Sequence, residues 1–172
     1  VMAVGGRARA EKKAILARLS AIEELAGMDV LCSDKTGTLT QNKLQLFDPV
    51  LIDSSRTPED LVFLAALAAK RMASGADAID TVVVNAVAEK DRGKFDDYSE
   101  LEFTPFDPVT KRTEARVSGP DGRELRVTKG ATKVVLELCA DRDAVRDRVM
   151  KANQDLANRG FRSIGVAVAR AG

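Results

Sequence analysis

The sequence contains no histidine and no tryptophan, and only 4% of its 172 residues are aromatic. The absence of histidine excludes serine–histidine–aspartate triads, histidine-based zinc sites and imidazole general bases. The two cysteines, Cys32 and Cys139, lie far apart and form no CxxC motif. This spacing predicts two buried thiols in a reducing compartment. Because aromatic residues are scarce, each phenylalanine in a polar stretch needs an explanation.

Long apolar runs are also missing. No stretch reaches the roughly 18 apolar residues that a membrane-spanning helix needs, and the N-terminus has no signal-peptide pattern. The formal net charge is only +1, and no basic run is interleaved with aromatic residues. We therefore expect no nucleic-acid partner. With 45% hydrophobic and 31% charged residues, the chain can form one soluble domain, or one domain and a piece of another.

The periodicity of apolar residues predicts an α+β fold. Helices are expected over residues 11–26, 58–73, 78–89, 132–139 and 142–158. Strands are expected at Val30–Cys32, from Tyr98 onward, and over 113–118, 123–128 and 164–169. Gly119-Pro120-Asp121-Gly122 reads as a hairpin turn between two of these strands. The pattern predicts a largely antiparallel, twisted sheet flanked by helices, which cluster on one side.

The most informative segment is Asp34-Lys35-Thr36-Gly37-Thr38-Leu39-Thr40, directly after the short apolar run. A carboxylate that attacks a phosphate needs a stiff element behind it, and N–H groups and hydroxyls in front to hold the phosphoryl oxygens. Lys35 adds a positive charge, and Thr36 and Thr38 supply hydroxyls. A lone aspartate in such a turn commonly only caps it. The septet as a whole favours Asp34 as a nucleophile that becomes an aspartyl phosphate.

The same septet resembles the phosphorylation motif of P-type ATPases, the cation pumps. It also resembles the wider class of dehalogenase-like phosphatases, which carry a second aspartate two residues after the nucleophile. Here that position is Thr36, and a hydroxyl is a poor general base at neutral pH. We therefore expect the acyl phosphate to persist, as a pump requires and a phosphatase does not.

Four further segments resemble the nucleotide-binding domain of these pumps. In the segment Phe103 to Arg112, the resemblance implies that Phe106 stacks on adenine and that Lys111 contacts the nucleotide. Stacking of a base on an aromatic face contributes ~1–3 kcal/mol. The alternative is that Phe106 is a core strand residue, as Phe103 is expected to be. Pro105 and Pro108 bracket Phe106 and limit strand pairing, which favours a strand end and the stacking role.

The other three segments are shorter. Lys129-Gly130-Ala131 resembles a motif whose lysine lines the nucleotide pocket and whose glycine permits close approach of the backbone. In Asp77-Ala78-Ile79-Asp80 the resemblance implies that Asp80 accepts a hydrogen bond from the adenine amino group, whereas Asp77 is expected to cap a helix. In the segment from Arg159 to Ser163, Arg162 is expected to reach ribose or phosphate.

The resemblance covers nearly the whole chain and lies nearest to plasma-membrane proton pumps. It implies that residues 1–45 are an N-terminal stub of a dehalogenase-like phosphorylation domain and that residues 46–172 are the nucleotide-binding domain. The expected ligands are ATP and Mg²⁺, the ion held by Asp34 and the Thr36 carbonyl with a further ligand outside this chain. We expect a soluble fragment from the cytosolic face of a plasma-membrane protein. Its partners would be the actuator domain, the rest of the phosphorylation domain and the membrane helices.

Two other functions stay open at this point. One is a free-standing dehalogenase-like phosphatase, and the other is a nucleotide-binding module without catalysis. Taken alone, the fragment is expected to bind ATP with little or no turnover. An apolar helix face in residues 1–45, if left uncovered, would favour self-association of the fragment.

Overall fold

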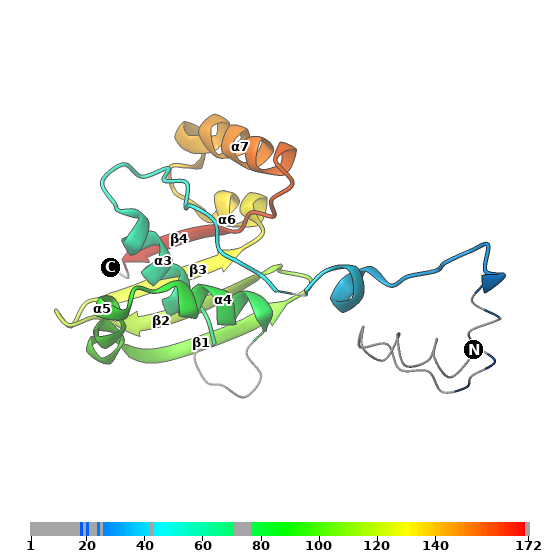
Figure 1. The fold of residues 1–172 in the computed structure, drawn as a ribbon. Coiled ribbons are helices and arrows are strands. Elements are labelled where there is room, and N and C mark those ends of the chain that lie inside the picture. The colour runs from blue at the N-terminus through cyan, green and yellow to red at the C-terminus, as the bar shows by residue number, and fades with distance from the viewer. Residues whose placement is uncertain are drawn as a thin grey trace. The chain divides into compact units, whose positions relative to one another are not determined.

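A computed structural model of the chain describes residues 18, 20, 24, 26–41, 43–70 and 77–170 (Figure 1). The chain divides into two compact units, Val1–Lys43 and Leu44–Gly172. Each unit is treated by itself below. Nearly all of the predicted helix over residues 11–26, including its apolar positions Ile15, Leu19, Ile22 and Leu25, lies outside the described residues.

In the first unit the predicted strand Val30–Cys32 is wrong. These residues have no strand pairing, and the Val30 and Leu31 side chains are each 75% exposed. Cys32, predicted to be buried, is exposed. A β-strand needs a neighbour for its backbone hydrogen bonds, and none pairs with these three residues within the described part of the unit. The segment leads into a single wide turn, η1 (Lys35–Leu39).

The second unit is built on a four-stranded antiparallel sheet in the order β1-β2-β3-β4. The strands are β1 (Ser99–Asp107), β2 (Arg112–Ser118), β3 (Glu124–Gly130) and β4 (Gly165–Arg170). The predicted hairpin is confirmed: β2 pairs with β3 without a register shift, from Ser118↔Glu124 to Arg112↔Gly130. Gly122 has φ +73° in the connecting turn, a conformation that glycine adopts without strain.

Helix α3 (Pro58–Leu67) begins as the sequence predicts. Thr57 and Asp60 form a reciprocal capping box, in which each side chain accepts from the other's backbone N–H. The bond that the Thr57 N–H donates to the Asp60 carboxylate is the main reason that the pKa of Asp60 lies below its ordinary value. The helix ends six residues before the expected Ala73, because the carbonyl of Ala68 accepts from Thr113 and the N–H of Lys70 donates to Asp80.

The remaining helices follow the predicted ranges with small changes. Helix α4 (Ala78–Ala86) starts at the expected cap, with Asp77 accepting from the Asp80 N–H. A short α5 (Glu89–Arg92) and the 3-10 turn η2 (Gly93–Asp97) lead into β1. Helices α6 (Thr132–Leu138) and α7 (Arg142–Asn158) precede β4. The class predicted from sequence, an antiparallel sheet flanked by helices, is confirmed.

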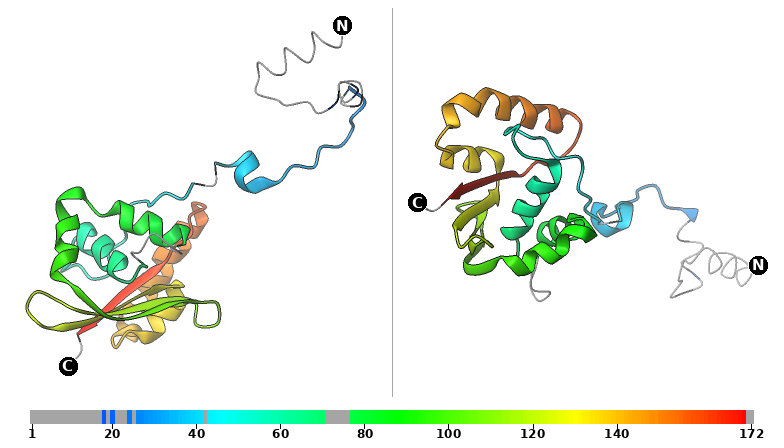
Figure 2. Two further views of the ribbon diagram at one scale, coloured as in Figure 1. Left: turned by 90° about the horizontal axis from the view of Figure 1, so that it is seen from below. Right: turned by 90° about the vertical axis from the view of Figure 1, so that its left-hand side faces the viewer.

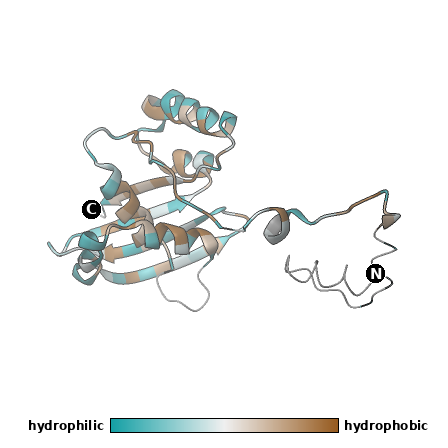
Figure 3. Cartoon of the chain, in the orientation of Figure 1, coloured by the Kyte–Doolittle hydropathy of each residue, from teal (hydrophilic) through white to brown (hydrophobic). Residues whose placement is uncertain are grey.

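The helices cover both faces of the sheet, and the expectation that they cluster on one side is wrong (Figure 2). On one face, Leu64 and Leu67 of α3 and the C-cap residue Ala68 pack on Ala115 and Val127. On the other face, a Cβ on Gly165 would lie 3.1 Å from Val135 of α6. Figure 3 shows α3 and α4 as largely hydrophobic ribbons and α7 with much hydrophilic colour, in line with the absence of fully buried residues from α7.

Within the residues that the structure describes, no helix is long and apolar enough to cross a lipid bilayer.

Candidate functional site: one end of the sheet

The six residues predicted to bind nucleotide gather at one end of the sheet. The β1–β2 turn carries Lys111, and Phe106 lies one residue before the end of β1. Strand pairing sets Gly130 opposite Arg112 on β2 and opposite Gly165 on β4. The loop that contains Arg162 leads into β4 at this same end. Asp80 reaches the group from α4 through an ion pair with Lys129.

Phe106 projects from the sheet end with 54% of its surface exposed. The pairing of β1 with β2 shifts register between Thr104 and Asp107, so Phe106 has no partner in the ladder. Phe103, in contrast, faces Ala115 and packs against the core. The structure therefore separates the two phenylalanines: Phe103 packs against the core and Phe106 is exposed, while the stacking role of Phe106 stays a prediction.

The turn that presents Lys111 is held by one carboxylate. Asp107 Oδ1 accepts from the N–H groups of Val109 and Thr110 at 2.9 and 2.8 Å, and the Lys111 N–H donates to the Asp107 carbonyl at 2.7 Å. The bond from the Thr110 N–H is the main reason that the pKa of Asp107 lies below its ordinary value. Lys111 itself has φ +53°, an uncommon conformation for a non-glycine residue, which this network holds.

Removal of the Asp107 carboxylate should lower the free energy of unfolding at neutral pH, and this loss should disappear in strong acid. A carboxyl whose pKa is depressed by folding stabilises the fold above its unfolded pKa, here 3.8, and loses that contribution as the pH falls through the lower folded value. We expect Asp107→Ala to have a lower urea midpoint than wild type at pH 7, with the gap closing below pH 3.8. Asp107→Asn keeps an oxygen that can accept the same N–H bonds, so its gap at pH 7 should be smaller than that of Asp107→Ala, and it should narrow over the same pH range because the titrating group is the wild-type carboxyl. A constant gap for Asp107→Ala would contradict this account of the turn.

At Gly130 the close approach that the motif implies is to the β1–β2 turn of the protein itself. A Cβ at this position would lie 2.7 Å from the Cα of Arg112 and closer still to the carbonyl oxygen of Lys111. That carbonyl also accepts from the Ala131 N–H at 3.0 Å. The glycine thus lets the β1–β2 turn lie directly against the end of β3, which fixes the Lys111 backbone beside Gly130.

Gly130→Ala is therefore expected to destabilise the fold by about 1–3 kcal/mol, the usual cost of overpacking. Gly93 is the matched control, because it has φ −61° and a Cβ there would meet nothing within 4 Å. Gly93→Ala should be neutral or slightly stabilising, since it mainly restricts the unfolded chain. Urea unfolding of both variants tests this, and equal midpoints would contradict the close approach.

Asp80 and Lys129 form a buried ion pair that the sequence did not predict. Their exposed fractions are 4% and 5%. Lys129 Nζ donates to Asp80 Oδ1 and, at 3.1 Å, to the hydroxyl of Thr113. Asp80 Oδ2 accepts from the Lys70 N–H at 2.8 Å. Both carboxylate oxygens are thus occupied by protein donors, so the expected direct bond from adenine to Asp80 stays a prediction that this geometry does not favour.

The loop around Arg162 contains a cluster that sequence reasoning missed. The rings of Phe47 and Phe161 stack with centroids 4.5 Å apart, and the guanidinium of Arg159 lies 5.0 Å from each centroid. Arg162 is exposed beside this cluster in the chain. The cluster ties the extended segment after Lys43 to the end of α7. Two phenylalanines in a chain so poor in aromatic residues are the signal that could have found it.

The predicted nucleophile lies in the first unit. Asp34 is exposed and makes no side-chain capping bond to η1, so the interpretation of this residue as a turn cap does not hold. Gly37 has φ +80°, and the Thr40 N–H closes the turn onto the Lys35 carbonyl at 3.1 Å. Lys35 and Thr38 are exposed. The Asp34 carboxylate and the side chains of Lys35 and Thr38 are thus accessible to a reactant.

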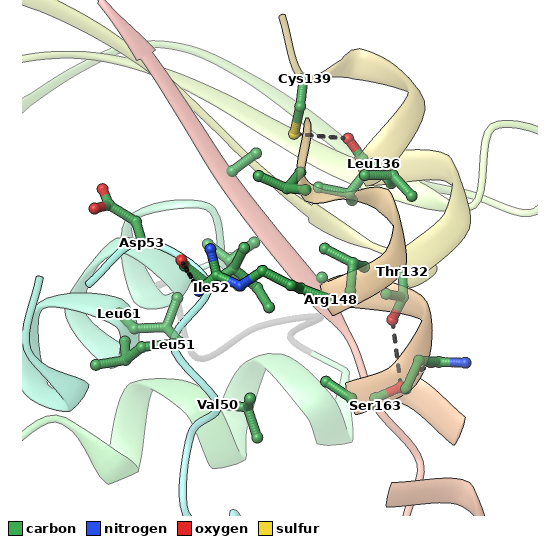
Figure 4. A pocket seen from close by; sticks show the side chains of 18 of the residues that line it. Val50, Leu51, Ile52, Asp53, Leu61, Thr132, Leu136, Cys139, Arg148 and Ser163 are labelled. Carbon is green, nitrogen blue, oxygen red and sulfur yellow. Dashed lines mark hydrogen bonds between the residues drawn. The ribbon is translucent and has the colours of Figure 1, made fainter. Parts of the chain in front are cut away.

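A cavity of about 570 Å³ lies elsewhere in the second unit (Figure 4). Val50–Ile52, α6, α7 and every residue from Ser163 to Val168 line it. Successive strand residues point to opposite faces, so a cavity that touches six in a row runs along the outer edge of β4. None of the six predicted nucleotide residues lines this cavity. The cavity is therefore not built from the predicted nucleotide residues, although Gly165, which pairs with Gly130 at that sheet end, lines it.

No group of three or more histidine, cysteine, aspartate or glutamate residues that could hold a metal ion occurs in the part of the chain that the structure describes. The thiol of Cys139 is half-buried and donates to the Val135 carbonyl at 3.4 Å. Burial raises its pKa, and the nearby Asp141 adds to the effect. Neither cysteine belongs to the sheet end.

Comparison with known proteins identifies the class. No family model matches the chain. Plasma membrane ATPase 2 of Schizosaccharomyces pombe is 44% identical over 172 residues, the match covering 96% of this chain and 17% of the relative. The plasma membrane ATPase of Neurospora crassa is 45% identical and plasma membrane ATPase 2 of Saccharomyces cerevisiae 44%, each over 96% of this chain and 19% and 18% of the relative.

The antiparallel sheet, the motif at Asp34 and these matches together define a piece of a P-type ATPase. The chain belongs to this family, in the branch of the plasma membrane ATPases. It spans less than a fifth of the length of these curated relatives.

Proposed function

We propose that the chain is the ATP-binding part of a P-type, proton-exporting ATPase of the plasma membrane, together with the start of the phosphorylation domain at residues 1–45. The observation that carries the proposal is the gathering of Phe106, Lys111 and Lys129–Gly130 at one sheet end. The similarity to plasma membrane ATPases supports it. The assignment of proton transport rests on family likeness alone, because no feature of the residues that the structure describes selects an ion.

In this proposal the adenine base stacks on the open face of Phe106. Lys111 and Arg162, both exposed, supply positive charge for the phosphates. Lys129 lines the site beneath them, and Gly130 allows the turn that carries Lys111 to approach. Asp80 would contribute to ATP binding indirectly, by holding the side chain of Lys129 in place.

The chemical step would take place at Asp34. A carboxylate oxygen attacks the γ-phosphorus, the bond between that phosphorus and the β–γ bridging oxygen breaks, and ADP leaves with the bridging oxygen. Lys35 and the hydroxyls of Thr36 and Thr38 are proposed to stabilise the charge on the transferring group. The persistence of the acyl phosphate follows from Thr36, which cannot act as a general base as the second aspartate of a phosphatase does.

Mg²⁺ is the cofactor that this chemistry requires. Hard oxygen donors suit it, and the exposed Asp34 carboxylate, free of any capping bond, is one. The Thr36 carbonyl would be the second. Since the described residues contain no larger acidic cluster, the remaining protein ligand would come from another part of the pump. When bound, the ion would offset the charge repulsion between carboxylate and phosphate.

Labelled ATP tests this function. The 172-residue chain is incubated with Mg²⁺ and γ-labelled ATP, and ATP binding is titrated in parallel. Measurable ATP binding supports the assignment, and an acid-stable label that Asp34→Asn abolishes would place the phosphate on Asp34. Release of phosphate from generic esters would instead indicate a phosphatase.

A nucleotide-binding module without catalysis is the second candidate for this chain in isolation. The division of the chain favours it, because Asp34 and the nucleotide-binding sheet end belong to different units. ATP binding without any label would support this candidate. A chain that binds no ATP at all would refute both.

A further inference from the structure

The buried ammonium of Lys129 has one hydrogen-bond donor to spare. A lysine ammonium carries three N–H groups. One donates to Asp80 Oδ1 and a second to Thr113 Oγ1 at 3.1 Å. Within the residues that the structure describes, the third has no protein acceptor. The Lys129 side chain is only 5% exposed, and an unsatisfied donor on a buried charged group is costly. The arrangement therefore points to an acceptor from outside the described chain.

Thr113 fixes the direction of this ammonium. Its hydroxyl has a single proton, which it donates to the Ala68 carbonyl at 2.7 Å, so its oxygen is left to accept from Lys129. Thr113 lies directly opposite Lys129 in the β2–β3 register, on the same face of the sheet. The end of α3, which supplies Ala68, thus orients the hydroxyl that orients the lysine.

Asp80 fixes the charge. Its Oδ2 is held by the Lys70 N–H at 2.8 Å, and its own N–H donates to Asp77 Oδ1 at 2.7 Å. The Asp80 backbone is thus held by Asp77, and its carboxylate is held at Oδ2 by the Lys70 N–H and at Oδ1 by Lys129, whose charge it balances. A lysine neutralised in this way has little net charge to offer a phosphate, but it keeps a directed N–H.

We propose that Thr113 and Asp80 are positioning residues, which hold Lys129 as a charge-balanced donor to an uncharged acceptor of the bound nucleotide, in its base or ribose. This inference rests on the proposed ATP-binding function and deepens it. In this proposal the exposed side chains of Lys111 and Arg162 bind the phosphates. Lys129 should accordingly contribute equally to the binding of ATP and of adenosine.

Thr113→Val and Thr113→Ser test the proposal in the 172-residue chain. Valine has nearly the shape of threonine but cannot accept a hydrogen bond, whereas serine can. We expect Thr113→Val to weaken the binding of both Mg·ATP and adenosine by about tenfold, the size expected for a hydrogen bond to a charged group. Thr113→Ser should stay within about twofold of wild type. If Thr113→Val does not fold, Thr113→Cys, a poor acceptor, takes its place in the comparison.

Thr128 offers a matched control. It is buried on the other face of the sheet, and its hydroxyl donates to the Thr113 carbonyl at 2.8 Å without touching Lys129. Thr128→Val should lower the urea midpoint much as Thr113→Val does but leave both affinities unchanged. A purely structural role for Thr113 would make the two valine variants alike in affinity as well as in stability.

Several results would overturn the inference. Unchanged affinities in Thr113→Val would do so, as would failure of serine to restore binding. A loss confined to ATP, with adenosine unaffected, would assign Lys129 to the phosphates instead. Wild-type protein that binds neither ligand would refute the proposed function together with this inference. Wild-type binding with an unaffected Thr113→Val refutes the inference alone.

Discussion

Asp80→Ala is expected to lower the free energy of unfolding by about 3–5 kcal/mol, the range measured when one partner of a buried ion pair is removed. The variant would leave the Lys129 ammonium, 95% of whose side chain is shielded from solvent, without its counter-ion. It would also remove the acceptor for the Lys70 N–H, which holds the turn after α3. Equilibrium urea unfolding measures the loss.

Two comparisons show whether burial is the cause. The double variant Asp80→Leu/Lys129→Met replaces both charges with apolar groups and should recover most of the lost stability, because an uncompensated buried charge is what destabilises the single variant. Glu137→Ala breaks an exposed pair with Arg146, 3.0 Å in length, and should cost far less stability because solvent screens an exposed pair. If Asp80→Ala loses no more stability to urea than Glu137→Ala does, the buried-pair interpretation is contradicted.

Phe106→Ala is expected to weaken ATP binding by about 5- to 150-fold, which corresponds to the ~1–3 kcal/mol contributed by stacking of one base on an aromatic ring. More than half of the Phe106 surface is exposed, and the residue lies at a register shift outside the regular ladder. Its removal should therefore change the stability of the fold little. Affinity is measured by titration with ATP, and stability by urea unfolding of the same samples.

Val109→Ala is the matched control for this substitution. Val109 belongs to the neighbouring turn and is 85% exposed, so it shares the location but offers no aromatic face. Its affinity for ATP should equal that of wild type. Phe106→Trp should retain binding, since tryptophan also stacks on a base. Equal affinities for wild type and Phe106→Ala would remove the main support for a nucleotide site at this sheet end.

Much of the architecture could be predicted because its signals are local. The Thr57–Asp60 capping box, the Gly119–Gly122 turn and the limits of α7 each depend on residues a few positions apart. The separate roles of Phe103 and Phe106 followed from the prolines around Phe106, which limit strand pairing. The apolar run Val30–Cys32 was misjudged, because whether such a run is buried depends on a partner strand and not on its own composition.

By itself, the sequence determined most of the order of helices and strands in the second unit and the chemistry available, since caps, turns and periodicity act over short distances. The sequence alone singled out Asp34, in its hydroxyl-rich turn, and Phe106, between two prolines. Only the tertiary structure paired Asp80 with Lys129, 49 positions apart in the chain. It also ended α3 early and required a glycine where β3 meets the β1–β2 turn. The physical reason is that buried charges and backbone groups must find partners, and which partners are near is decided by strand register and helix packing.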